Sequence, residues 1–314
     1  MLRHNCSLNN APVKPVILGL LILETILGLA GNFFALWIFT YRLKTWKPCT
    51  IYLFNLSVAD FFLNICLPFR IHFFLTEKWI FKDPFCRINL FLLNLNRAGS
   101  VAFLTAVTLD RYLRVIHPHR RFSLLSTKSA KKVVCFTWLL VLSVTIHILT
   151  EQKIGVTECK TFNTNGSATS SVWQESIFFV ELLFPFFINV FCTVCIIKKL
   201  RDLNMDKQHR VRKAVHLVVS VVVVYAVCFL PSILSRIALL VLEKSENCKG
   251  LQTAVNAFDV SLTITYLNSA MDPIVYCFTS PTFRAAYREA LNSIKLRFIK
   301  EETQGSETSK DSDS

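Results

Sequence analysis

Long runs of apolar residues, each broken by only a few polar positions, recur seven times along the chain. Folded as an α-helix at about 1.5 Å per residue, each run is long enough to cross the roughly 30 Å hydrocarbon core of a bilayer. The runs are 16–41, 50–75, 86–112, 133–150, 173–197, 214–242 and 251–278. This pattern predicts an all-α fold, a bundle of seven transmembrane helices.

Polar segments flank the runs and divide the chain into four parts. The parts are an extracellular tail at 1–15, a transmembrane domain at 16–280, a short amphipathic membrane-surface helix at 281–300 and a disordered cytoplasmic tail at 301–314. The surface helix is predicted because apolar residues such as Phe283 and Tyr287 share one face and basic residues lie opposite. The last part is acidic and rich in Ser and Thr, a composition that buries too little apolar surface to fold.

The composition agrees with a membrane protein. Of the 314 residues, 53% are hydrophobic and 18% charged, and the mean hydropathy is +0.44, which is more apolar than a water-soluble domain requires. The net charge is +14, but the basic residues gather in the loops after the first, third and fifth runs and after the seventh, which argues against nucleic-acid binding. Because cytoplasmic loops are enriched in Lys and Arg, we predict an extracellular N-terminus and a cytoplasmic C-terminus at the plasma membrane.

Four of the eleven cysteines lie in loops or at run ends on the predicted outer side, and so do both glycosylation sequons. The cysteines are Cys6, Cys86, Cys159 and Cys248, and the acceptor asparagines are Asn5 and Asn165. Four cysteines on an oxidising side allow three disulfide connectivities. The cysteines, the sequons and the basic loops therefore indicate the same orientation.

Three arginines lie in the outer half of the predicted bundle, where a charge needs a partner or a function. Arg97 lies inside the third run, Arg236 in the sixth and Arg70 near the outer end of the second. One hypothesis makes Arg97 a structural residue paired with a buried acid such as Asp60 or Glu24. The other makes it a fork-shaped donor for a ligand carboxylate. We favour an anion pocket because no acids matching the three arginines are evident, although Arg70 could instead reach the membrane interface.

A second group of polar residues is predicted deeper in the bundle, around Asp60. Its other members are Asn32, Asn96, Ser100, Asn268 and Asp272. One hypothesis is a hydrogen-bonded structural network. The other is a sodium site, because an oxygen-rich cluster with two carboxylates suits a hard cation.

Short motifs recur in order along the runs. They are Asn55-Leu56-Ser57-Val58-Ala59-Asp60, Asp110-Arg111-Tyr112, Trp138, Pro185, Cys228-Phe229-Leu230-Pro231 and Asp272-Pro273-Ile274-Val275-Tyr276. Together they resemble the class A (rhodopsin-type) G-protein-coupled receptors over residues 16–300. The stretches LNRAGSVAFLTAV, MDKQHRVRKAV, CFLPSILSRI and TYLNSAMDPIVY resemble the branch that contains the hydroxycarboxylic acid receptors and the receptors for oxo- and hydroxy-eicosanoids.

The resemblance implies roles for individual residues. It assigns anion contacts to Arg97, Arg236 and Tyr266, and it favours sodium at Asp60, Asn96, Ser100, Asn268 and Asp272. It implies a cytoplasmic switch at Asp110, Arg111, Tyr112 and Tyr276, in which a neighbouring acid holds the arginine until a partner competes for it. It also implies a Cys86–Cys159 disulfide, which leaves Cys6 and Cys248 as the remaining pair. Phe229, ahead of Pro231, occupies the toggle position where most of the class has Trp.

The predicted function is a G-protein-coupled receptor for a carboxylate ligand, a hydroxycarboxylic acid or an oxidised fatty acid such as an eicosanoid, with Arg97 as its main anchor. The resemblance implies an inhibitory-class heterotrimeric G protein, and the tail suggests a receptor kinase and arrestin as further partners. The alternative is an organic-anion transporter using the same arginines, although the two halves show no internal repeat. We expect neither an enzyme, since GxSxG, HExxH and phosphate-loop motifs are missing, nor a cofactor other than allosteric sodium.

Overall fold

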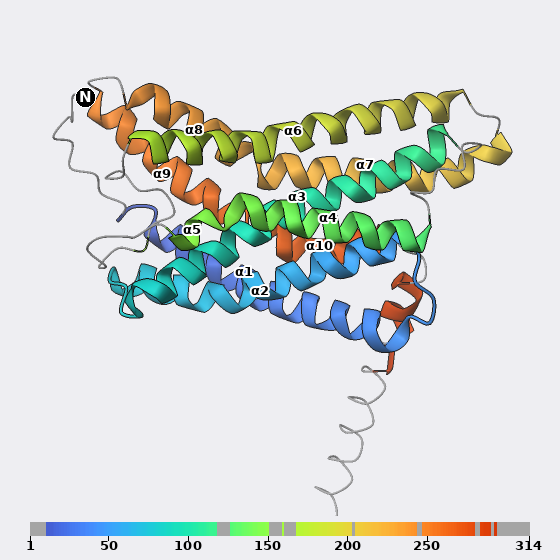
Figure 1. Ribbon diagram of the computed structural model, residues 1–314, viewed down its shortest axis with the longest axis horizontal. Helices are drawn as coiled ribbons and strands as arrows, with labels where there is room; N and C mark the ends of the chain where they lie inside the picture. Colours follow the sequence, from blue (N-terminus) through green and yellow to red (C-terminus); the bar gives the residue numbers. More distant parts are fainter. Residues whose placement is uncertain are drawn as a thin grey trace, which may run out of the picture.

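The computed structural model of the chain describes residues 11–117, 126–150, 159, 168–202, 205–243, 247–279, 283–289 and 292–293. Within these residues every regular element is a helix, and the long helices lie side by side in one elongated bundle (Figure 1). The elements are α1 Lys14–Trp37 with the π-helical turn η1 Ile38–Arg42, α2 Pro48–Thr76, α3 Lys82–Ile116, α4 Thr127–Thr145, α5 His147–Thr150, α6 Ala168–Arg201, α7 Met205–Cys228, α8 Leu230–Leu242, α9 Cys248–Ile264 and α10 Leu267–Thr279.

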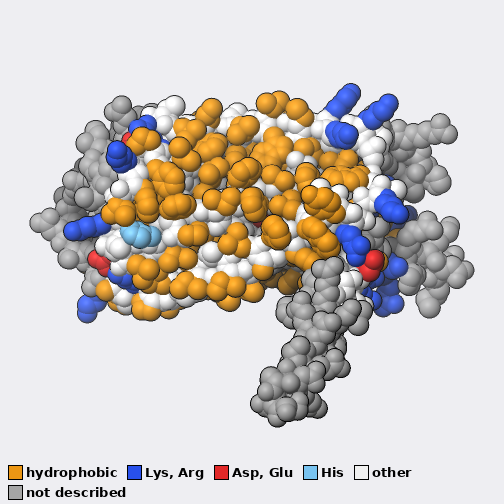
Figure 2. All heavy atoms as spheres, turned by 90° about the horizontal axis from the view of Figure 1, so that it is seen from below, with side chains coloured by type: hydrophobic (Ala, Val, Ile, Leu, Met, Phe, Trp, Pro, Cys, Tyr) orange, Lys and Arg blue, Asp and Glu red, His pale blue; other side chains and the backbone are white. Residues whose placement is uncertain are grey.

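Six helical stretches in the described residues are long and apolar enough to cross a membrane. Helices α9 and α10 follow each other through a short turn and supply the seventh passage. Figure 2 shows a broad hydrophobic belt along the middle of the bundle, with Lys and Arg side chains gathered towards its two ends. The all-α fold predicted from the apolar runs is confirmed, and the chain is a multi-pass membrane protein.

Two of the predicted runs are divided rather than continuous. The run 214–242 is interrupted at Phe229, because Pro231 has no N–H to donate to the preceding turn and its ring crowds that turn. The run 251–278 is interrupted at Thr265 and Tyr266, where the amide of Tyr266 donates to the carbonyl of Thr263 at 2.9 Å in a tighter i→i+3 turn. This second break places Tyr266 at the junction of α9 and α10.

Helix α3 is the most enclosed part of the architecture. All residues from 93 to 101 are buried, so this stretch meets neighbouring helices on every side. It packs against α2, α4, α6 and α7. Polar bonds reinforce the packing of the other helices: the indole of Trp138 in α4 donates to Asn55 in α2 at 2.9 Å, and Asn32 in α1 donates to the carbonyl of Ser269 in α10 at 2.8 Å.

The predicted surface helix is described at 283–289 and again at 292–293, and the rest of 281–300 lies outside the described residues, as do the tail 301–314 and residues 1–10. Phe283 is fully buried, with its ring centroid 5.0 Å from that of Phe39 and 5.8 Å from that of Tyr276. The apolar face of this helix therefore closes the end of the bundle near η1 and α10.

The contact between α1 and α10 makes a testable demand on Gly31. A Cβ atom added there would lie 2.8 Å from Cγ of Pro273, whereas one added at Gly19 would meet nothing within 4 Å. Because the proline ring cannot rotate away, Gly31→Ala should lower the free energy of unfolding by about 1–3 kcal/mol.

Gly19→Ala is the matched control and should leave stability unchanged or slightly higher, since Ala favours helix over Gly. Thermal unfolding of the detergent-solubilised protein can be followed with a thiol-reactive dye, because Cys66 and Cys228 are buried free thiols. Equal transition temperatures for the two variants would show that α1 and α10 are not packed this closely.

Candidate functional site

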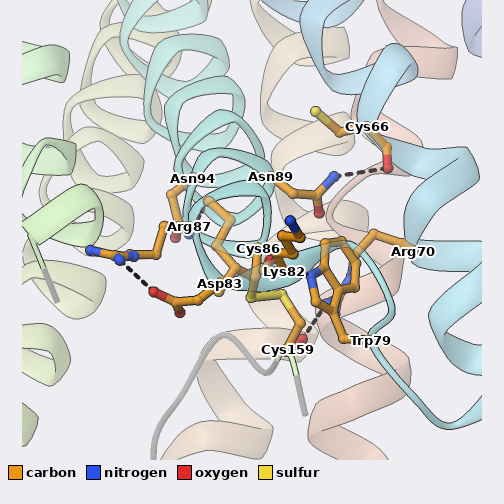
Figure 3. The surroundings of a disulfide bond; sticks show 11 residues. Cys66, Arg70, Trp79, Lys82, Asp83, Cys86, Arg87, Asn89, Asn94 and Cys159 are labelled. Atoms are coloured by element: carbon orange, nitrogen blue, oxygen red, sulfur yellow. Dashed lines mark hydrogen bonds and ion pairs between the residues drawn. A yellow bond between two sulfur atoms is a disulfide. The ribbon is translucent and has the colours of Figure 1, made fainter. Parts of the chain in front are cut away.

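A disulfide fixes the outer end of the bundle. Cys86 at the start of α3 is bonded to Cys159, with Cα atoms 5.8 Å apart, which confirms that predicted pair. Figure 3 shows Arg70 and Trp79 beside this bond. Cys248 is also disulfide-bonded, whereas Cys6 and the sequon residues Asn5 and Asn165 lie outside the described residues.

Arg70 is a buried cation with no acid bound to it. Its side chain is 6% exposed, and Nη1 donates to the carbonyl of Cys159 at 2.7 Å. The guanidinium lies 5.5 Å from the ring centroids of both Phe73 and Phe74. Nε is buried without a hydrogen-bond partner, and no ion pair joins Arg70 to a carboxylate in the described part of the chain; Asp259 acts on it only through a longer-range attraction.

Arg97 has a dedicated partner that the sequence analysis missed. Its Nε donates to Oε1 of Glu181 in α6 at 3.0 Å, and Nη2 lies 3.5 Å from Oε2. Both side chains are withdrawn from solvent, at 7% and 9% exposure. The hypothesis of a buried acid partner for Arg97 therefore agrees with the structure, but the acid is neither Asp60 nor Glu24: Asp60 is engaged deeper in the bundle, and both carboxylate oxygens of Glu24 are buried without a partner.

Arg236 of α8 is paired in the same way, with a glutamate that lies nearer the outer end of α6. Its Nε donates to Oε2 of Glu175 at 2.9 Å, and Nη2 contacts the other oxygen of the same carboxylate. The expectation that the arginines lack matching acids is therefore wrong for two of the three. The sequence contained a signal for these partners: Glu175 and Glu181 lie inside an apolar run, where an ionisable side chain needs a counter-charge.

Aromatic rings link these two ion pairs. The guanidinium of Arg97 lies 5.2 Å from the ring centroid of Phe178, and that of Arg236 lies 5.0 Å from the ring centroid of Phe258. The two rings are in turn 6.3 Å apart. Tyr266, 6% exposed at the α9–α10 junction, is close enough to Arg70 and Arg97 to interact electrostatically with both. The structure thus brings the four predicted anion contacts into the outer half of one bundle.

The predicted polar group around Asp60 is assembled as a buried network. Asn96 donates to Oδ1 of Asp60 at 2.9 Å, Tyr276 donates to Oδ2 at 3.2 Å, and Asn268 donates to Asp272 at 3.0 Å. The carboxyl groups of Asp60 and Asp272 are close enough to interact electrostatically, and Ser100 is close enough to act on Asp60. Three buried oxygens nearby form no hydrogen bond by distance and angle with the described residues: Oγ of Ser100, Oδ1 of Asn268 and Oδ1 of Asp272.

At the opposite end of α3, the expected pairing of Asp110 with Arg111 is wrong for this conformation. Asp110 instead accepts two bonds from Arg114, at 2.9 and 3.0 Å. Arg114 wins because it lies four residues further along the same helix face, where a bidentate pair forms without strain. Arg111 lies close to the thiol of Cys49 in α2, and Asp110 acts on it through a longer-range attraction without an ion pair between them in the described part of the chain.

The remaining predicted positions fall in different places. Tyr276 joins the Asp60 network rather than the end of α3. Tyr112 packs near Phe191 of α6, with ring centroids 6.0 Å apart. Phe229 is fully buried and lies 4.9 Å from the ring of Tyr225, at the break that Pro231 introduces.

Comparisons with known proteins agree with this architecture. The sequence model of the family described as "7 transmembrane receptor (rhodopsin family)" matches residues 31–276. The mouse 12-(S)-hydroxy-5,8,10,14-eicosatetraenoic acid receptor is 41% identical over 303 residues, which cover 95% of each chain. Human hydroxycarboxylic acid receptor 2 is 40% identical over 288 residues, 89% of this chain and 78% of its own. Human oxoeicosanoid receptor 1 is 36% identical over 293 residues, 93% of this chain and 75% of its own.

The different partners of Arg70 and Arg236 lead to opposite stability predictions for one substitution. Arg70→Met removes a buried charge that forms no ion pair with the described residues, so the free energy of unfolding should stay the same or rise by up to about 2 kcal/mol. Arg236→Met leaves the buried carboxylate of Glu175 without its ion-pair partner and should lower the free energy of unfolding by roughly 1–3 kcal/mol. Thermal unfolding in detergent measures both. A larger loss for Arg70→Met than for Arg236→Met would make Arg70 a structural residue.

Proposed function

The chain belongs to the rhodopsin family of seven-transmembrane receptors, and on that premise we propose that its agonist carries a carboxylate group. Membership makes it a receptor rather than an enzyme, with a small-molecule agonist and a G protein as its partners. The transporter alternative is not supported, because the family and the three relatives are all named as receptors.

The observation that carries the proposal is the guanidinium of Arg70, which forms no ion pair with the described residues and lies close to Tyr266, as Arg97 does. A buried charge without a carboxylate in contact is costly, and inside a membrane domain it marks a functional site. The arginine fork offers parallel N–H donors that match a carboxylate. A phenol close to both guanidinium groups adds a neutral donor to the same pocket.

The names of the relatives support the same ligand class. The mouse and human relatives are named for hydroxycarboxylic acids and for eicosanoids, and the two ligand types differ in chain length but share the acid group. We therefore propose that the carboxylate is held by Arg97 and Arg70, with Tyr266 beside them and Arg236 nearer the entrance. The chain length of the ligand that this receptor prefers can be found by assaying a panel of acids of graded length.

Signalling follows the family pattern in this proposal. The N-terminus is extracellular, the ligand enters from that side, and an inhibitory-class G protein docks at Arg111 and the basic loops. A receptor kinase phosphorylates Ser306, Thr308, Ser309, Ser312 or Ser314, and arrestin then binds the tail, since each phosphate adds about −1.5 to −2 charge. Sensitivity of the response to pertussis toxin tests the G-protein class.

A sodium ion fits the network around Asp60 and Asp272. Two buried carboxyl groups that interact this strongly do not both ionise unless a cation lies near them. The unpartnered oxygens of Ser100, Asn268 and Asp272 supply the hard ligands that such an ion requires. Because Asp60 lies on α2 and Asp272 on α10, a bound ion would tie these two helices together.

The anchoring arginines should control potency. Arg97→Ala and Arg70→Ala should each raise the agonist concentration for half-maximal G-protein activation by about ten- to a hundredfold, equivalent to about 1.5–3 kcal/mol. Lysine at either position should restore only part of this, because an ammonium group cannot form the planar fork. Agonist-stimulated GTPγS loading measures the effect.

Two controls keep this result interpretable. Surface expression must match wild type, since a structural arginine would reduce delivery to the membrane as well as potency. Arg236→Ala should weaken the response less, because its side chain lies nearer the solvent, at 11% exposure. Unchanged potency in a well-expressed Arg97→Ala receptor would remove Arg97 from the binding site.

Sodium should stabilise the receptor through Asp60. At sodium concentrations ten- to a hundredfold above Kd, the free energy of unfolding should rise by about 1–3 kcal/mol relative to potassium at equal ionic strength. Asp60→Asn should abolish the difference, because the amide replaces a charged ligand of the ion. An equal effect of the two cations on the wild-type receptor would exclude a selective site.

A further inference from the structure

Two glutamates of α6 act as ties between helices. Glu181 joins α6 to α3 through Arg97, and Glu175 joins α6 to α8 through Arg236. The inner tie is the more deeply buried, at 7% and 9% exposure against 11% and 17% for the outer one. The Glu181 carboxylate thus occupies the same guanidinium that the ligand carboxylate needs.

We propose that Glu181 is a built-in competitor of the ligand: the agonist carboxylate replaces it on Arg97, and this exchange releases α6 from α3. The proposal rests on the carboxylate ligand proposed above. In this role Glu181 limits the affinity for the ligand and couples binding to helix movement. A ligand drives a conformational change only through contacts that differ between the two states, and the contact with Arg97 is such a contact.

Occupied donors explain why the two carboxylates compete. Nε and Nη2 of Arg97 already face the two oxygens of Glu181, so this side of the guanidinium has no donor left for a ligand. Glu181 also neutralises the charge of Arg97 in a site withdrawn from water, which weakens the attraction of Arg97 for a second carboxylate. The ligand carboxylate gains the full attraction of Arg97, in addition to that of Arg70, only when Glu181 leaves.

Geometry also gives the displaced side chain a destination. Tyr225 of α7 lies close enough to interact electrostatically with both Glu181 and Arg97, and its hydroxyl now donates to the carbonyl of Leu182 in α6. If the Tyr225 hydroxyl turned from the Leu182 carbonyl to donate its hydrogen bond to Glu181, Glu181 would exchange its tie to α3 for a tie to α7. Since the ring of Tyr225 packs at a tilt against that of Phe229, with centroids 4.9 Å apart at the α7–α8 break, the exchange reaches the point where that passage bends.

The test compares four receptors: wild type, Glu181→Gln, Glu175→Gln and the double variant Glu181→Gln/Arg97→Gln. Glutamine keeps the size and one acceptor of glutamate and removes only its charge. Each receptor is assayed by GTPγS loading with 12-(S)-hydroxy-5,8,10,14-eicosatetraenoic acid and with 3-hydroxy acids of graded chain length. The methyl ester of each active acid serves as the uncharged ligand control.

We expect Glu181→Gln to lower the half-maximal concentration of the active acids by about tenfold and to raise ligand-independent loading. The gain should vanish in the double variant and should not occur with the methyl ester. Glu175→Gln removes the same charge from the same helix but leaves the Arg97–Glu181 pair intact, so its gain should be smaller.

Two outcomes overturn the competitor role while leaving the carboxylate ligand in place. Equal gains for Glu181→Gln and Glu175→Gln would reduce the effect to overall charge, and lower potency for Glu181→Gln would make Glu181 a residue that positions Arg97. The failure of every acid to activate the wild-type receptor is a separate outcome, which refutes the proposed function itself and this inference with it.

Discussion

The arrangement of this receptor depends on one constraint: a charged side chain buried between transmembrane helices must find its counter-charge inside the bundle. Arg97 and Arg236 satisfy it with Glu181 and Glu175, both from α6. These pairs set the position of α6 against α3 and α8, because each side chain would be costly to bury alone. Arg70 is the exception among the three arginines, since its partner is a backbone carbonyl held by the Cys86–Cys159 disulfide.

The sequence predicted the features that depend on the apolar runs and on the isolated polar residues within those runs. Seven apolar runs became a seven-helix bundle, and Asp60, Asn96, Asn268 and Asp272 came together as one buried network. These predictions succeed because the membrane leaves few alternatives: backbone groups must bond within helices, and polar side chains must face inward.

The partners of individual charges could not be predicted in the same way. Pairing depends on the rotation of each helix about its axis and on its depth in the bundle, which the sequence constrains only loosely. Asp60 and Glu24 were therefore named as examples of a partner for Arg97, whereas the structure pairs it with Glu181. Asp110 likewise pairs with Arg114, the residue one helical turn on, rather than with its immediate neighbour Arg111. A search for every acid within an apolar run would have found Glu181, because such a residue also requires a partner.

A structure of the receptor with a carboxylate agonist bound tests most directly whether the outer arginines receive the ligand. The ligand carboxylate should lie within hydrogen-bonding distance of Arg97 and Arg70, and the Glu181 carboxylate should have moved beyond ion-pair distance from Arg97. A complex in which the Arg97–Glu181 pair is intact and the ligand carboxylate contacts neither arginine would contradict both the anion pocket and the exchange of partners.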